Sequence, residues 1–198
     1  MNIINAIKTG DVKRAPRLEA MLSKAIETNK QRELSYVRQA TIDALTGCKN
    51  RRAFDSDIAA LMNDHQPFAL ALVDIDNFKS INDTWGHLNG DIVLRNVARE
   101  GLQVLQPLEI SLYRYGGEEF VVVLPGVSLA HATAIADRIQ QKIREAGLPH
   151  AASAVASEVT VSIGIVASDG TVPIETLIAR ADSALYQAKN KGRNQWSY

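Results

Sequence analysis

The sequence has little cysteine, no long apolar segment and no excess of basic charge. Its one cysteine, Cys48, excludes an internal disulfide and is typical of a reducing compartment. No apolar run approaches the roughly 18 residues that a membrane-spanning helix requires. The first residues, Met-Asn-Ile-Ile-Asn-Ala-Ile-Lys, lack the apolar core and the cleavage site of a secretory signal. We therefore expect a soluble, cytoplasmic protein with no membrane partner in this chain.

The charged residues are balanced in number, because Lys and Arg total 22 and Asp and Glu also total 22. A protein whose main partner is nucleic acid usually carries a basic excess, so the composition argues against that function. Hydrophobic residues make up 46% and charged residues 22% of the 198 residues, which is typical of a folded globular chain. The length suits one domain of ordinary size with an appendage.

Residues 1–40 differ in character from the rest of the chain, and we interpret them as a helical stalk or linker. They are polar, and their apolar residues recur at helical spacing: Leu18, Met21, Leu22, Ala25 and Ile26, continued by Leu34, Val37 and Ala40. Such an amphipathic helix needs a partner for its apolar stripe, either the following domain or a second copy of itself. The heptad spacing is too irregular to identify a coiled coil, so dimerisation through this segment stays open.

Helical and strand-like patterns alternate over residues 41–198, which predicts one domain. The strands are expected at 68–75, 110–115, 120–124 and 159–165, with a short edge strand within 194–198. The helices are expected at 51–62, from 91 onward, at 129–143 and, opened by Pro173, at 173–188. A tight turn makes two of the strands antiparallel, so the order predicts a mixed central sheet flanked by helices, of the α/β or α+β class.

The stretch 114–120 (Arg-Tyr-Gly-Gly-Glu-Glu-Phe) connects two of the expected strands. Gly116 and Gly117 predict a type I′ turn, because that turn needs φ > 0 at both central positions. A turn without side chains also lets a bulky ligand lie against its backbone. Two carboxylates, Glu118 and Glu119, follow at once, and acidic groups beside bare backbone suggest a metal and phosphate site. The alternative is a solvated acidic turn.

The apolar run 68–75 suits a central strand that is buried on both faces, and Asp74 stands at its end. If the hairpin is the neighbour of this strand, Asp74 and Glu118 are able to share one metal ion. Carboxylate oxygens without a cluster of His or Cys favour Mg²⁺ or Mn²⁺ over zinc. Such a centre commonly holds the phosphates of a nucleoside triphosphate. The alternative is that Asp74 is a structural or solvated carboxylate.

The segment 77–91 is polar, is punctuated by glycines and lies between a buried strand and a helix, where α/β folds tend to bind ligands. Lys79 is able to reach a phosphate as a point charge. Asn82 and Asp91 together suit a guanine edge, because adenine lacks the pair of donors that the carboxylate would accept. The alternative is that Asp91 caps the helix that starts at Ile92.

Lys189 and Arg193 are basic residues near the end of the last predicted helix, four positions apart. Two cations in this place complement the helix dipole as a routine matter, and that interpretation explains most such pairs. A role in binding phosphate therefore needs support from beyond the spacing.

Five motifs, in the same order along the chain, resemble the GGDEF family of bacterial diguanylate cyclases. They cover about residues 41–198 and leave the stalk outside: 43–46 (Asp-Ala-Leu-Thr) with 50–51 (Asn-Arg), 74–91, 114–120, 161–165 (Val-Ser-Ile-Gly-Ile) and 181–194. The resemblance implies a palm-like sheet related to that of nucleotidyl cyclases. It also implies that two domains, each holding one GTP, meet and form cyclic di-GMP with release of two pyrophosphates, in second-messenger signalling.

The resemblance also assigns roles to the residues at matching positions. Asp74, the carbonyl of Ile75 and Glu118 would hold Mg²⁺. Glu118 would in addition act as base for the attacking 3′-hydroxyl, and Glu119 would support the metal site. The substrate would be held by residues for the phosphates (Lys79, which stabilises the transition state, with Lys189 and Arg193), for guanine (Asn82 and Asp91) and for the pocket wall (His87, Gly116 and Gly117).

The chemistry implied by the resemblance needs two copies of the domain. Each hydroxyl must reach the α-phosphorus of the other nucleotide in line, and one domain has residues for only one guanine. We therefore expect an active homodimer, transient or permanent. The short stalk suggests either that the chain is a fragment of a longer protein or that an upstream sensory partner is supplied elsewhere.

Two departures from the family pattern concern activity and regulation. The third position of the signature is Glu118 rather than Asp, a variant shared by many active members that keeps the carboxylate. Many members carry an inhibitory product-binding Arg-x-x-Asp before the signature glycines, and here that window is 107–110 (Pro-Leu-Glu-Ile). Arg138, where some members place a second product-contacting arginine, does not replace the motif alone. We expect little product inhibition through this site.

Three rival functions agree less well with the residues. A catalytically dead receptor typically loses the 114–120 run or the aspartate at the strand end, and both are intact here. A cyclase that makes mixed adenine–guanine dinucleotides typically replaces the residue at the position of Asp91, which this sequence retains. A pure protein-interaction module would leave the whole set of site residues without a purpose.

Overall fold

The computed structural model describes residues 15–150 and 157–198. The chain divides into two units, residues 1–40 and residues 41–198. In the first unit, helix α2 (Ala15–Thr41) confirms the helix predicted there, whereas residues 1–14 of the predicted stalk lie outside the described residues. No helix in the described ranges has the length and the apolar character that crossing a membrane requires.

The apolar stripe predicted for the stalk lies on α2. Its largest described side chains are exposed: Met21, Leu22, Ile26 and Val37. The side chains of Leu18 and Leu34, which belong to the same predicted stripe, lie outside the described ones. An exposed apolar row on a helix of this length is the kind of surface that a second helix covers.

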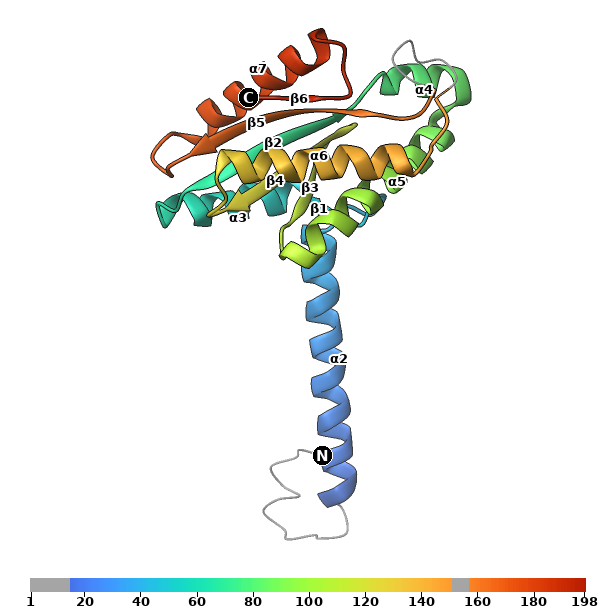
Figure 1. Ribbon diagram of the computed structural model, residues 1–198. Coiled ribbons are helices and arrows are strands. Elements are labelled where there is room, and N and C mark those ends of the chain that lie inside the picture. The colour runs from blue at the N-terminus through green and yellow to red at the C-terminus, as the bar shows by residue number, and fades with distance from the viewer. Residues whose placement is uncertain (1–14, 151–156) are drawn as a thin grey trace. The chain divides into compact units, whose positions relative to one another are not determined.

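The second unit is built on one mixed sheet of six strands in the order β1-β3-β4-β2-β5-β6 (Figure 1). The strands are β1 (Lys49–Asn50), β2 (Phe68–Ile75), β3 (Leu112–Gly116), β4 (Glu119–Pro125), β5 (Val161–Ser168) and β6 (Trp196–Ser197). The pairs β1–β3 and β5–β6 are parallel and the others antiparallel, so the predicted mixed sheet is confirmed. The predicted edge strand is β6.

Strand β2 is the centre of the sheet, as its sequence predicts, and the hairpin β3–β4 lies directly beside it. All eight residues of β2 are buried, and their side chains alternate between two cores. This explains why the run is almost wholly apolar: a strand covered on both faces has no solvent side on which to place polar residues. The two polar exceptions at its end, Asp74 and then Asp76 beyond it, are also buried.

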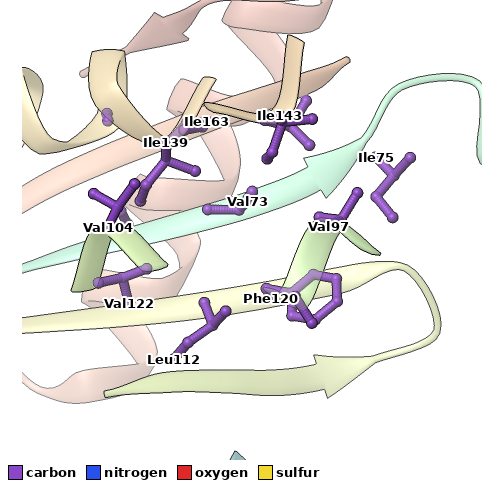
Figure 2. Close-up of a cluster of buried hydrophobic side chains, with 14 of the residues drawn as sticks. Val73, Ile75, Val97, Val104, Leu112, Phe120, Val122, Ile139, Ile143 and Ile163 are labelled. Carbon is purple, nitrogen blue, oxygen red and sulfur yellow. The ribbon is translucent and has the colours of Figure 1, made fainter. Parts of the chain in front are cut away.

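Two layers of helices cover the sheet. The helices are α3 (Arg51–Asn63), α4 (Phe78–Trp85), α5 (His87–Leu105), α6 (Leu129–Glu145) and α7 (Ile174–Asn190), with a short 3₁₀ turn η1 (Gln106–Leu108). Figure 2 shows the core beneath α5 and α6, where Val73 of β2 lies among Val97, Ile139 and Phe120. Helices α3 and α7 cover the other core, which contains Leu70 and Leu72.

Three local features differ from what the sequence predicted. The segment 77–91, interpreted as a polar segment before a helix expected from residue 91, is mostly helical, because α4 fills 78–85 and α5 begins at His87. Gly86, with φ of 79°, separates the two helices, and a short polar helix between two breaks resembles a loop in sequence. The two-residue strand β1 was not expected, and Pro173 is the N-cap of α7 rather than part of its first turn.

Helix α7 lies unusually close to the sheet at Gly164, the residue of β5 that pairs with Leu72. A Cβ atom at Gly164 would overlap the carbonyl oxygen of Ala181 and the backbone nitrogen of Leu185. Ala181, Ala184 and Ala188 of α7 are buried, so small residues line the contact. The close approach fixes the height of α7 above β2 and β5, and with it the position of the residues at the end of the helix.

We predict that Gly164→Ala lowers the free energy of unfolding by about 1–3 kcal/mol, because the added methyl group forces backbone atoms of α7 away from the sheet. Unfolding in urea measures the change. Ala167→Val in the same strand is the matched control, because residue 167 is exposed, and it should alter stability by less than about 0.5 kcal/mol. Equal stability of Gly164→Ala and the parent protein would contradict the close packing.

Candidate active site

The candidate site lies where β2 ends and β4 begins. Asp74 pairs with Glu119 across the β2–β4 ladder and with Ser162 across the β2–β5 ladder, so it is held between two neighbouring strands. Glu118 stands in the turn immediately before Glu119 and is half-buried, whereas Glu119 is exposed. The predicted proximity of the strand-end aspartate to the hairpin carboxylates is therefore present.

The turn of the hairpin differs from the predicted type I′ geometry. Gly116 is the last residue of β3, and the two turn residues are Gly117 and Glu118. Only Gly117, with φ of 38°, has a positive φ, so just one of the two positions requires glycine conformation. The register shifts between Arg114 and Gly116, and this β-bulge moves the turn forward by one residue. As a result Glu118 lies in the turn itself.

Arg114 fastens this turn to the beginning of the domain. Its Nε and Nη2 atoms donate to the carbonyl oxygen of Gly117 at 3.1 and 2.9 Å, and its Nη1 lies 3.2 Å from Oδ1 of Asp43. Asp43 also accepts from the backbone nitrogen and the hydroxyl of Thr46, at 2.9 and 2.7 Å. Burial opposes ionisation of Asp43, but the bonds from Thr46 and the charge of Arg114 outweigh it and lower the pKa of this carboxyl.

The sequence alone did not reveal the role of Arg114 in positioning. The available signal was its place directly before the Tyr-Gly-Gly run, since a planar guanidinium is suited to hold a turn carbonyl and a carboxylate together. Its ion-pair partner Asp43 lies 71 residues earlier, so this partner could not be identified from the spacing of residues in the sequence.

Asp74 forms an ion pair with Lys189, whose Nζ lies 2.9 Å from its Oδ1. The side chain of Asp74 is only 10% exposed, and that of Lys189 is 31% exposed. The pKa of Asp74 is raised to about 6 overall. Burial is the main cause and raises it, the hydrogen bond and charge of Lys189 lower it, and the charges of Glu118 and Glu119 raise it further. The site is thus a partly desolvated concentration of negative charge with one cation beside it.

The atoms that could bind a metal ion at the end of β2 are oxygen atoms. Among the described residues, no group of three or more His, Cys, Asp or Glu side chains lies close enough to bind a metal ion by itself. Asp74 and Glu118 supply two carboxylates, and a backbone carbonyl and substrate oxygens would have to complete the shell. This donor chemistry fits a hard cation such as Mg²⁺, which usually binds to one or two carboxylates together with phosphates and waters.

The two residues expected to recognise guanine lie on the helix pair α4–α5. Asn82 of α4 contacts Gly90 of α5 so closely that a Cβ atom at Gly90 would collide with its Oδ1. Asp91 follows Gly90 and is half-buried. The alternative of an Asp91 N-cap is wrong, because α5 begins at His87 with Gly86 as its N-cap. The glycine therefore allows the Asn82 side chain to reach the backbone beside Asp91.

The remaining predicted site residues are the two exposed side chains of α4 and α5 and the two basic residues near the end of α7. Lys79 of α4 and His87 of α5 are exposed. Lys189 lies in the last turn of α7, but Arg193 lies beyond the helix in a left-handed conformation with φ of 61°. The two cations therefore do not share a helix face, and the simple dipole interpretation applies to Lys189 alone.

Asp76 organises the backbone behind the site. Its carboxylate is buried and accepts from the Thr160 and Ser162 hydroxyls, both at 2.7 Å, and from the backbone nitrogen of Asn194 at 3.0 Å. These bonds join the end of β2, the start of β5 and the segment that carries Arg193. This structural role of Asp76, whose two carboxylate oxygens both accept hydrogen bonds, was not predicted from the sequence.

The window that lacks the inhibitory motif faces a surface hollow of about 500 Å³. Its walls include Leu108, Ile110 and Ile135, and Arg138 supplies a guanidinium. Pro107 stands at the position where the motif would place its arginine, and Ile110 at the position of its aspartate. The hollow therefore offers a phosphate group few charged partners.

The comparisons with known proteins agree on one group. The sequence model of the family described as "Diguanylate cyclase, GGDEF domain" matches residues 40–195. Diguanylate cyclase VdcA of Vibrio cholerae is 40% identical over 159 residues, which is 80% of this chain and 47% of that protein. The response regulator PleD of Caulobacter vibrioides is 37% identical, over 97% of this chain and 46% of its own length. The chain thus spans about half the length of these relatives.

A solved structure gives a similar result for the fold. The coiled coil and GGDEF domain of DgcB from Caulobacter crescentus, in complex with c-di-GMP, superimposes with a TM-score of 0.80. The sequences are 30% identical, and the match covers 93% of this chain and 98% of that one. The predicted α/β class with a palm-like sheet and an N-terminal helix is confirmed.

We predict that Asp74→Asn raises the free energy of unfolding by about 1–3 kcal/mol at pH 8 in metal-free buffer. The pKa of Asp74 is raised from 3.8 to about 6 in the folded state, so the ionised carboxylate opposes folding above pH 6. The folded protein binds the proton more tightly than the unfolded chain, and the advantage of the variant should therefore shrink as the pH falls from 6 toward 4. Unfolding in urea at several pH values measures this.

Asp182→Asn on the exposed face of α7 is the matched control for this experiment, and its effect should not change with pH over the same range. An Asp74→Asn protein that is less stable than the parent at pH 8 would show that the Lys189 ion pair outweighs the desolvation of the carboxylate.

Proposed function

Because the chain belongs to the GGDEF diguanylate cyclase family, we propose that it is a nucleotidyltransferase that condenses two GTP into cyclic di-GMP with release of two pyrophosphates. The observation that carries the proposal is that Asp74, Glu118, Glu119 and Lys189 lie together at the end of the central strand β2. Clustered carboxylates with a neighbouring lysine are suited to a metal-bound triphosphate. GTP as substrate and a second-messenger product imply a cytoplasmic enzyme.

Asp74 and Glu118, with the carbonyl oxygen of Ile75, would hold Mg²⁺, with Mn²⁺ as the alternative. The oxygen-only donor set and the burial of Asp74 support this assignment. When bound, the ion neutralises charge that builds on the triphosphate during phosphoryl transfer. Glu119, the ladder partner of Asp74, would add negative charge from the strand side and support the metal site.

Glu118 would accept the proton of the attacking 3′-hydroxyl. The bond that forms joins this 3′ oxygen to the α-phosphorus of the other GTP, and the bond that breaks releases pyrophosphate. Lys79, Lys189 and Arg193 would bind the phosphates and stabilise the transferring group, since each carries a positive charge that complements phosphate oxygens. Arg114 would act indirectly, because it holds the carbonyl of the turn residue that precedes Glu118.

Asn82 and Asp91 would recognise guanine. A half-buried carboxylate accepts well from N1–H and the exocyclic amine of guanine, whereas adenine would leave it without donors. His87 would line the same pocket from the start of α5. Gly116 and Gly117 would allow the nucleotide to approach the hairpin backbone, because no side chain stands in the way.

One domain of this kind supplies residues for one guanine, so the reaction requires a homodimer that brings two half-sites together. Residues 41–198 would form the catalytic domain and residues 1–40 the stalk. The exposed apolar side chains of α2 give the stalk a surface for self-association. An upstream sensory partner would control the approach of the two domains through this segment.

Product feedback through the window at 107–110 would be weak. Arg138 is the only arginine among the residues that line the hollow there, and a single guanidinium binds a dinucleotide with far fewer charge-assisted bonds than an Arg-x-x-Asp motif with a second arginine.

The proposed activity is tested by incubating the protein with GTP and Mg²⁺ and separating the nucleotides. We expect cyclic di-GMP from the parent protein and a rate lower by about 10²–10⁴ for Glu118→Gln, because the amide cannot accept the proton. Glu145→Gln, at the far end of α6, is the matched control and should retain the parent rate. Absence of any cyclic dinucleotide from the parent at high protein concentration would overturn the proposal.

Guanine recognition is tested by comparing GTP and ATP. Asp91→Ser should reduce the preference for GTP by about 10–100-fold in kcat/KM, because the donors of guanine lose their acceptor. Asp83→Asn, an exposed change in α4, should leave the preference unchanged. An Asp91→Ser enzyme with undiminished discrimination would remove Asp91 from the recognition of the base.

A further inference from the structure

Lys189 and Asp74 form the one ion pair between the end of α7 and the end of β2 in the described part of the chain, with Nζ and Oδ1 2.9 Å apart. We propose that Lys189 is the resident counter-ion of Asp74, that it opposes the binding of a free divalent cation, and that it leaves Asp74 for the triphosphate when metal and nucleotide bind together. This inference rests on the proposed function. It makes Lys189 the residue that couples the metal site to the nucleotide.

The first argument is that the Lys189 ammonium group and a divalent metal ion both need the carboxylate of Asp74. Asp74 is buried, and Glu118 and Glu119 add negative charge close by. A lysine ammonium in contact with Asp74 cancels part of this field and occupies one side of the carboxylate. A divalent ion that bound alone would therefore lie close to the positive charge of Lys189, and repulsion between two cations is strong in a partly desolvated site.

The second argument is that the triphosphate resolves this conflict. Phosphate oxygens offer Lys189 a new anionic partner and offer the metal further oxygen ligands at the same time. The exchange would keep every charge paired, because Lys189 would move from the carboxylate to a phosphate and Asp74 would then be able to help hold the metal ion. Metal and nucleotide should then each strengthen the binding of the other, because coupling between two ligands is reciprocal.

The third argument is that only the side chain has to move. Ala181 and Leu185 fix α7 on Gly164, and the end of the helix is closed by bonds from Arg193 nitrogen and Gln195 Nε2 to the carbonyl oxygen of Ala188. The backbone of Lys189 is thus held in place. Its four-carbon stem is flexible and 31% exposed, so rotations about that stem are sufficient to carry the ammonium group to a new partner.

The experiment measures binding of Mn²⁺ alone to the full chain, by the electron paramagnetic resonance signal of the free ion. Three proteins are compared: the parent, Lys189→Met, which keeps the length without the charge, and Lys191→Met, an exposed matched control two residues away. We expect Lys189→Met to bind Mn²⁺ alone about tenfold more tightly than the parent. Lys191→Met should match the parent.

The same titrations are repeated with a non-hydrolysable GTP analogue present. The analogue should tighten Mn²⁺ binding to the parent by about tenfold or more, and this gain should be largely lost in Lys189→Met. Asp74→Asn, combined with Lys189→Met, should remove the tight Mn²⁺ site and so verify its location. Thermal unfolding confirms that each variant is folded, and Lys189→Arg, which keeps the charge, should retain weak binding of Mn²⁺ alone.

A Lys189→Met protein that is folded but binds Mn²⁺ alone no more tightly than the parent would overturn the inference. That result is separate from failure of the proposed function, which would appear as a parent protein that makes no cyclic di-GMP from GTP and Mg²⁺. An active parent with unchanged Mn²⁺ affinity in Lys189→Met rejects only the counter-ion role, whereas an inactive parent rejects the function on which the exchange to triphosphate depends.

Discussion

The negative charge of Asp74, held at the buried end of the central strand, is the constraint on which the site depends. A carboxylate in this place is costly, and burial raises its pKa to about 6 in spite of the lysine beside it. Two further carboxylates stand on the adjoining hairpin, which increases the cost. The protein tolerates this because a cation is able to offset it, and the fold provides one such cation from α7. The destabilisation of the site and its capacity to bind metal and phosphate have the same electrostatic cause.

Two polar assemblies keep this arrangement in shape without taking part in it. Arg114 joins the hairpin turn to Asp43 near the start of the domain. Asp76 joins β2 to β5 and to the segment after α7. In both cases one charged group forms hydrogen bonds with several groups from chain segments far apart in sequence. These bonds offset the free-energy cost of burying the charge. Arg114 thereby supports the turn that contains Glu118, and Asp76 supports the segment that follows the helix of Lys189.

The parts of the fold that the sequence predicted well are those with a strong apolar signature. Strand β2 was identified to the residue because eight buried positions leave an unbroken apolar run. Its neighbours followed from the hairpin, and the amphipathic helices α6 and α7 followed from their spacing. The catalytic and binding residues came mostly from the resemblance to a family, since single carboxylates and lysines carry no such periodic signal.

What the sequence did not predict depends on exact backbone geometry or on long-range partners. The bulge near Tyr115 moves the turn by one residue, and no periodic pattern encodes a bulge. Helix α4 is only eight residues long and lies between breaks, so it resembled a loop. The pairing of Lys189 with Asp74 joins positions 115 residues apart, as the difference of their numbers shows, and depends on how closely α7 packs.

Gly164 of β5 indicates whether α7 is able to pack close enough to the sheet for Lys189 to reach Asp74. Gly164 carries no reactive group, yet any side chain there would lift α7 and draw the ammonium of Lys189 away from the central carboxylate. A genetic screen or a survey of natural variants that inspects only acidic and basic site residues would score such a chain as competent. Residue 164 should therefore be read together with the hairpin signature whenever the competence of a related sequence is judged.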